Sequence, residues 1–254
     1  MANMLQLKVT MCHLKPPIWR RVEVPDTLTF WEFHFVLQIL FDWQNSHLFE
    51  FRRGRGTPDE FLAGTPRVGP DTDMAPEWQQ DCRDVVLANV LTAPKQKLTY
   101  VYDFGDYWEH EIVVEKVQPL VQGHPTPAVR CLAGRRAAPS EDIGGFPGYD
   151  QLMEVLTEKA DGKRKQLPGY FAGLGKYDPN EFDLASFNHD LGLLRQIVAQ
   201  EDAFIAEYSA ELARNPPSKN QPSDLNAFLN QLAASFPSPA PAQKKKPDKK
   251  KPDK

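Results

Sequence analysis

The sequence predicts a single α+β domain in which a mixed or antiparallel β-sheet packs against helices, followed by a C-terminal helical extension and a disordered lysine-rich tail. Three observations lead to this fold class. Apolar and polar residues alternate at 4–14 and 18–24 as in strands, residues 29–43 have the apolar spacing of a helix, and the chain ends in KKKPDKKKPDK. We therefore place the domain at residues 1–215, a linker with a short docking helix at 216–236, and the tail at 237–254.

The first half of the domain begins with two strands that Pro16 and Pro17 separate, which is typical of a hairpin-like opening. Thr29 and Glu32 have the spacing of a capping box, so the following helix is expected to begin there and to form the centre of the core. Another strand is expected at 47–51. Residues 57–80 are rich in Pro, Gly and Asp, and this long excursion is functional, disordered or contains a further element.

The second half is expected to contain one hairpin and several helices. The hairpin occupies 98–117, and a short amphipathic helix follows at 149–156. Asp183 is a plausible N-cap of one long helix that continues toward Arg214 and ends before Pro216. Residues 223–232 can form a last small helix, which is too short for independent stability and is expected to dock on the domain.

The hairpin has a preferred register. A three-residue loop of Phe104, Gly105 and Asp106, with Gly105 at positive φ, brings Asp103 opposite Tyr107. In this register the aromatic and apolar side chains share one face of the hairpin and the glutamates lie on the other. A slip of one residue would exchange the two faces. It pairs Tyr102 with Trp108, Tyr100 with His110 and Leu98 with Ile112. His110 is therefore expected either to pack in the core or to act as a ligand or acid–base group.

Composition excludes several classes of protein. No apolar run approaches the roughly 18 residues that a membrane span needs, and the N-terminus lacks the order of a secretory signal, so we expect a cytoplasmic protein without membrane contact. Cys12, Cys82 and Cys131 are far apart and indicate neither a disulfide framework nor a zinc knuckle. Their thiols are expected to be reduced and mostly buried.

The net charge divides into an acidic body and a basic tail. Residues 244–254 contain seven Lys and two Asp, for a net charge of +5, and the remaining 23 basic and 32 acidic residues leave −9. Such a tail either contacts nucleic acid through phosphate charge or only keeps the chain soluble. The residues expected to make the nucleic-acid contact are Lys244, Lys245, Lys246, Lys249, Lys250 and Lys251.

The stretch from Tyr102 to Asp106, followed by Trp108 and His110, resembles the motif of the Ri-plasmid open-reading-frame-three-like family, which also carries an insertion-element passenger resolvase-like label. The blocks IWRR at 18–21, HLFEF at 47–51 and PSEDIGG at 139–145 resemble the family in the same order. The resemblance implies an α+β fold and an association with plasmids and mobile elements. One departure is Ser140, where the family usually has a second proline. The scattered arginines do not support a resolvase, which needs several of them around a nucleophilic hydroxyl.

Carboxylates and one histidine form the candidate functional group near the hairpin turn. The candidates are Asp103, Asp106, His110, Glu141 and Asp142, of which Asp103, Asp106, His110 and Asp142 are the candidate metal ligands. Carboxylates suit Mg²⁺ or Mn²⁺, and a histidine adds affinity for transition metals. The same acids also serve as turn and helix-entry residues, so a purely structural role is the competing interpretation.

Two functions follow from these observations. The first is a binding or regulatory domain of mobile elements, without a resident cofactor, that contacts nucleic acid through the tail or another protein through its acidic loops. The alternative is a divalent-metal-dependent hydrolase, similar to a nuclease, that uses the turn around Asp103, Asp106 and His110. The sequence assigns no catalytic residue and leaves the oligomeric state open.

Overall fold

The computed structural model describes residues 2–53, 61–64, 81–120 and 128–214. Their strands form one seven-stranded antiparallel sheet in the order β4-β3-β5-β6-β1-β2-β7. The strand bounds are β1 Asn3–Met11, β2 Trp19–Pro25, β3 Phe49–Arg52, β4 Phe61–Gly64, β5 Lys97–Tyr102, β6 Trp108–Pro119 and β7 Arg130–Arg135. The predicted α+β class is confirmed, and the sheet is antiparallel throughout.

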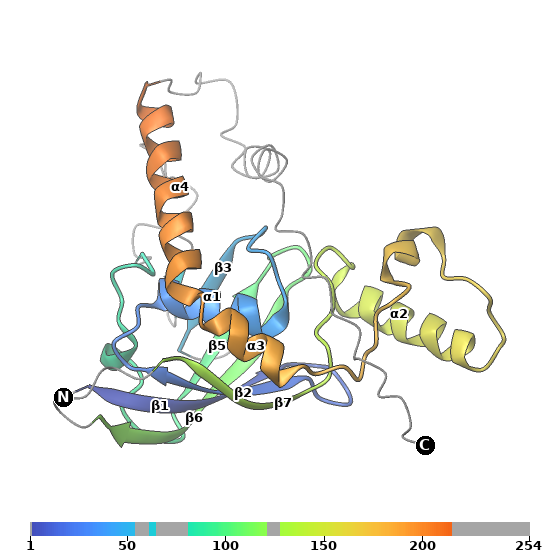
Figure 1. Cartoon of the computed structure of the whole chain (residues 1–254), viewed down its shortest axis with the longest axis horizontal. Helices are drawn as coiled ribbons and strands as arrows, with labels where there is room; N and C mark the ends of the chain where they lie inside the picture. The colour runs from blue at the N-terminus through green and yellow to red at the C-terminus, as the bar shows by residue number, and fades with distance from the viewer. Residues whose placement is uncertain (1, 54–60, 65–80, 121–127, 215–254) are drawn as a thin grey trace, which may run out of the picture. The chain divides into compact units, whose positions relative to one another are not determined.

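The described residues form four α-helices besides the sheet, and Figure 1 shows α1 and α3 beside it. Their bounds are α1 Phe30–Phe41, α2 Gly145–Ala160, α3 Leu184–Leu191 and α4 Leu194–Arg214, with 3₁₀ turns at Leu87–Asn89 and Gly169–Leu174. None of the described helices is both long and apolar enough to cross a bilayer. The three cysteines are buried thiols, as expected.

Helix α1 is the centre of the core, as predicted. The Glu32 backbone N–H donates to Thr29 Oγ1 at 3.2 Å, and the Thr29 backbone N–H donates to Glu32 Oε2 at 2.8 Å, which completes the capping box. The helix ends at Asp42, whose φ of 57° is left-handed. Phe30 and Phe33 are fully buried and pack on Phe51 of β3. Burial of each such ring contributes about 1.5–3 kcal/mol, so this aromatic layer fixes α1 on the sheet.

The register predicted for the central hairpin is confirmed. Strands β5 and β6 pair Tyr102 with Trp108, Tyr100 with His110 and Leu98 with Ile112. The prediction that Gly105 supplies the positive φ is wrong, because Asp103 and Tyr107 adopt it instead, at 58° and 56°. A Cβ at Gly105 would lie 3.2 Å from Asp103 Oδ1. The glycine therefore makes room for the Asp103 carboxylate over the turn.

Other elements differ from the prediction. Strand β4 lies inside the excursion at 57–80, and β7 is an additional edge strand. Helix α2 begins at Gly145, ahead of the predicted helix. The single long helix predicted after Asp183 is two helices, because α3 ends at Leu191 with Gly192 as its C-cap and α4 begins at Leu194. Helix α3 packs on β7, where Asn188 hydrogen-bonds both backbone groups of Cys131, and both α3 and α4 contact α1. The expected helix at 223–232 and the tail lie outside the described residues.

Candidate functional site

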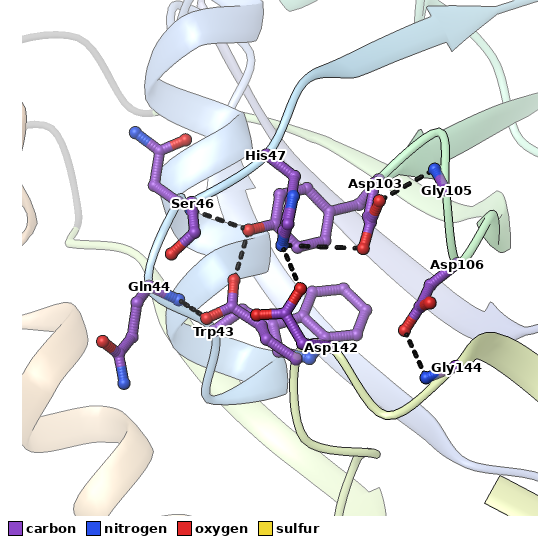
Figure 2. A network of polar contacts seen from close by, with 12 residues as sticks. Trp43, Gln44, Ser46, His47, Asp103, Gly105, Asp106, Asp142 and Gly144 are labelled. Carbon is purple, nitrogen blue, oxygen red and sulfur yellow. Dashed lines mark hydrogen bonds and ion pairs between the residues drawn. The ribbon is translucent and has the colours of Figure 1, made fainter. Parts of the chain in front are cut away.

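One histidine and two aspartates meet at the end of the central hairpin (Figure 2). The Nε2 atom of His47 lies 3.1 Å from Oδ1 of Asp142 and 3.6 Å from Oδ2 of Asp103. One ligand atom from each of the three residues lies within 4.8 Å of the others. We call these three residues the His47 cluster.

The hairpin turn positions Asp103 in this cluster. Its backbone is left-handed, and its N–H donates to the carbonyl of Leu48 at 2.9 Å, beside His47. Its Oδ1 atom accepts the backbone N–H of Gly105 at 2.9 Å, so one carboxylate oxygen stabilises the turn and Oδ2 faces the imidazole. The side chain is 8% exposed. Asp103 therefore fills the structural role and reaches the cluster with the same carboxylate.

The loop after β7 brings Asp142 to the same place. Asp142 has φ of 57°, and Gly144 and Gly145 follow it with φ of 91° and 64°. The Gly144 N–H donates to Asp106 Oδ2 at 3.1 Å, and a Cβ at Gly145 would lie 2.7 Å from the Asp106 carbonyl oxygen. The two loops are therefore in close backbone contact. The Asp142 side chain is 76% exposed, which opens the cluster to solvent.

His47 lies at the end of the loop that follows α1. Asn45 in this loop is left-handed, with φ of 58°, and its N–H donates to Gln38 Oε1 at 2.8 Å. Its side-chain oxygen lies 2.8 Å from His34 Nε2, and the other nitrogen of His34 lies 2.9 Å from the Tyr100 hydroxyl. Burial lowers the pKa of His34 to about 3, so the ring is neutral at pH 7. A buried neutral network therefore holds the loop of His47.

A second pair of polar residues lies beside the cluster. The Tyr102 hydroxyl donates a short hydrogen bond to Glu141 Oε1 and accepts the Ser46 N–H at 3.0 Å. Glu141 Oε2 accepts the Gln44 N–H at 3.1 Å. Burial, followed by the negative charge of Glu141, raises the pKa of Tyr102 well above its ordinary value. The phenol therefore keeps its proton and remains a donor to Glu141.

The structure brings together only part of the predicted site. Asp103 and Asp142 join the cluster, Glu141 lies next to it, and Asp106 bonds Gly144 instead. His110 does not belong with them: its side chain is fully buried, its Nδ1 lies 3.0 Å from the Trp108 carbonyl oxygen, and burial lowers its pKa to about 3. Its ring packs on Phe41 and Trp43. The interpretation of His110 as a core residue therefore fits the structure.

His47 is the member that sequence reasoning missed. It is the first residue of the HLFEF block at 47–51, which resembles the family, and this membership was the available signal. Its Nε2 atom is inaccessible to solvent and has no hydrogen-bond partner among the described residues, although two carboxylates are close. An imidazole nitrogen beside two carboxylate oxygens is a donor set for a divalent transition-metal ion.

The comparisons with known proteins place the chain in a family. The family model described as "Plasmid pRiA4b ORF-3-like protein" matches residues 3–186. The curated "Uncharacterized protein y4hQ" of Sinorhizobium fredii is 34% identical over 194 residues, which cover 74% of this chain and 90% of that protein. The crystal structure of the protein of unknown function MM3350 from Methanosarcina mazei Go1 matches with a TM-score of 0.56 and 30% identity, over 72% of this chain and 97% of that one. This chain belongs to the plasmid pRiA4b ORF-3-like protein family.

Proposed function

We propose that this protein binds a divalent metal ion through His47, Asp103 and Asp142 and uses it to activate water for hydrolysis. The observation that carries the proposal is the convergence of three ligand atoms within 4.8 Å of one another. Carboxylates bind hard and transition-metal ions alike, whereas imidazole favours the transition metals. The mixed donor set therefore suits Mn²⁺ or Zn²⁺ better than Ca²⁺.

The exposure of the cluster supports a catalytic use of the ion. Catalytic metal sites commonly take three protein ligands and keep a further position for water or substrate. Asp103 is buried and bound into its turn and His47 Nε2 is inaccessible to solvent, whereas the Asp142 side chain faces solvent, so a water ligand would approach the ion on the Asp142 side. A bound ion lowers the pKa of its water ligand to about 7 in favourable sites, which supplies hydroxide near neutral pH.

An ion-pair network is the competing explanation of the same contacts. A protonated His47 between two carboxylates would satisfy the electrostatics without any metal ion. Partly exposed ion pairs of this kind contribute only about 0–1 kcal/mol to folding. This explanation predicts that added metal ions change neither the thermal stability nor the heat of titration.

Titration of chelator-treated protein with Mn²⁺, Zn²⁺, Mg²⁺ and Ca²⁺ distinguishes these explanations. We expect one Mn²⁺ or Zn²⁺ ion per chain. At an ion concentration of about 100 times the Kd, binding stabilises the fold by about 2.7 kcal/mol and raises the Tm by about 5–10 °C. His47→Ala abolishes the shift. His13→Ala, which removes a different histidine–carboxylate pair with Glu109, retains it. The absence of Mn²⁺ and Zn²⁺ binding by the wild-type chain would overturn the metal site.

Hydrolysis is tested on the metal-loaded protein with three chromogenic probes: bis(p-nitrophenyl) phosphate, p-nitrophenyl phosphate and p-nitrophenyl acetate. We expect metal-dependent release of nitrophenol from one of them, lost in His47→Ala. The phosphodiester probe tests the nuclease-like form of the hypothesis. If the chain binds the ion but hydrolyses none of the three probes, the proposed metal site stands and the proposed hydrolase activity is overturned.

A second candidate function is a binding or regulatory domain of mobile elements that contacts nucleic acid through its tail. The division between a body of −9 and a tail of +5 supports it, as does the plasmid origin in the family's description. Deletion of residues 244–254 should weaken binding to DNA or RNA and reduce its dependence on salt. Equal binding by the shortened chain, or no binding by the full chain at low salt, would contradict this function.

A further inference from the structure

We propose that Tyr102 and Glu141 are positioning residues that hold the loops of His47 and Asp142 at the spacing a shared metal ion requires. This inference rests on the proposed metal site. Neither side chain belongs to the His47 cluster itself. The hydrogen bonds of Tyr102 and Glu141 reach the backbone next to two of the cluster's ligands.

The contacts form a continuous path between the two loops. Glu141 accepts the N–H of Gln44 with one oxygen and the hydroxyl of Tyr102 with the other. Tyr102 in turn accepts the N–H of Ser46 at 3.0 Å. Ser46 directly precedes His47, and Glu141 directly precedes Asp142. The path therefore ends one residue away from a ligand on each side.

Tyr102 is a rigid support for this path. It is the last residue of β5, is fully buried, and pairs with Phe49 on one side and Trp108 on the other. Its ring stacks on Trp43 at 4.9 Å and meets the His47 ring edge-on at 5.9 Å. The position of its hydroxyl is consequently fixed by the sheet.

Asp103, the third ligand of the proposed site, has supports other than the Tyr102–Glu141 hydrogen bond. The positioning role of Tyr102 and Glu141 therefore concerns the other two ligands. Asp103 is held by the β5–β6 turn, in which its Oδ1 accepts the Gly105 N–H, and by its own N–H, which donates to the Leu48 carbonyl. Loss of the Tyr102–Glu141 contact therefore loosens residues 44–46 and the loop of Asp142, and it leaves the hairpin and its Asp103–Leu48 hydrogen bond intact. Residues that orient metal ligands in this way typically change metal affinity 10–100-fold when they are substituted.

Two substitutions test the pair with little change in shape. Tyr102→Phe keeps the ring and removes both hydrogen bonds of the hydroxyl. Glu141→Gln keeps one acceptor oxygen, which can serve either the Gln44 N–H or the Tyr102 hydroxyl. Its NH₂ group then faces the other of these two donors. Glu111→Gln is the matched control, because Glu111 is paired with Lys97 at 2.8 Å and lies outside the cluster. Circular dichroism and melting without metal are expected to show native folds for all three.

The expected result is 10–100-fold weaker Mn²⁺ binding in Tyr102→Phe and Glu141→Gln, with the control within about 2-fold of wild type. With Co²⁺ as a spectroscopic probe, the visible absorption of the two variants should change in intensity, because the ligand geometry is distorted. Without metal, hydrogen exchange at the amides of Gln44 and Ser46 should accelerate in both variants.

The outcomes separate the positioning role from the proposed metal site. Wild-type affinity and spectra in both variants would overturn the positioning role and leave the metal site standing. Unchanged amide exchange at Gln44 and Ser46 would also overturn the positioning role, whatever ion is bound. A wild-type chain that binds no ion would overturn the proposed metal site and this inference with it.

Discussion

The Nε2 atom of His47 lies 3.1 Å from the Oδ1 atom of Asp142, although His47 follows helix α1 and Asp142 follows strand β7. The Asp142 side chain is 76% exposed, so the pair contributes little to stability as an ion pair. Both residues of the contact nevertheless sit in loops with left-handed residues and fixed hydrogen bonds. Under the proposed metal binding, each of the two loops places one ligand atom in the His47 cluster.

Asp142→Asn should weaken Mn²⁺ binding by at least about 10-fold, because the amide is a neutral and poorer ligand than the carboxylate. Asparagine tolerates the left-handed backbone of this position, so the unfolding free energy should change by less than about 0.5 kcal/mol. Titration calorimetry and urea denaturation measure the two quantities. Asp161→Asn removes another exposed carboxylate, paired with Lys163, and should change neither. Equal weakening by both variants would indicate a general charge effect.

Asp106→Ala should destabilise the fold by about 0.5–2 kcal/mol and leave metal affinity unchanged. Its carboxylate accepts the N–H of Gly144 at the start of α2 and makes no contact within the His47 cluster. Chemical denaturation in chelator measures the first effect, and Mn²⁺ titration measures the second. A loss of metal binding in a folded Asp106→Ala variant would return Asp106 to the ligand set that the sequence suggested.

Gly145→Ala should destabilise the fold by more than about 2 kcal/mol and weaken metal binding. Gly145 has φ of 64°, and an added Cβ would meet the Asp106 backbone oxygen at 2.7 Å, so the loop of Asp142 must move away from the hairpin turn. Thermal melts and Mn²⁺ titration check both effects. Gly173→Ala adds a Cβ with no atom within 4 Å and should be neutral. A native melt for Gly145→Ala would show that the two loops separate at little cost.

Stability should fall as the pH decreases below about 6.5, in part because of His34. Its pKa is about 3 in the fold and near 6.5 when unfolded, so between these values only the unfolded state binds the proton. The slope approaches about 1.4 kcal/mol per pH unit, or about 2 kcal/mol between pH 7 and pH 5. Urea denaturation at both pH values should show a smaller difference for His34→Gln. Burial raises the pKa values of Asp42 and Glu201, and this shift stabilises the fold as the pH falls. It opposes the effect of His34 and is the same in the wild type and in His34→Gln. An unchanged pH dependence in the variant would show that His34 is protonated in the fold.

Local patterns predicted the central elements well because they depend on neighbours in the chain. Thr29 and Glu32 marked the start of α1, since a capping box uses only residues within one helical turn. The alternation of aromatic and acidic residues set the β5–β6 register, since a slip would bury glutamates. Strand β4 was missed because it has four residues, and the break at Gly192 was missed because α3 is held by its contacts with β7, which is far away in the chain.

The sequence by itself determined the α+β class and the hairpin with His110 on its inner face, and it named Asp103 and Asp142 among five candidate site residues. Only the tertiary structure decided that His47 joins them and that His110 does not. Proximity in the chain suggested His110, but the strand period turns its side chain toward α1 and into the core. His47 lies close to the aspartates because α1 packs on the sheet, which places the loop after α1 next to the hairpin turn. Such a meeting of three separate loops depends on packing between distant segments, which no local pattern encodes.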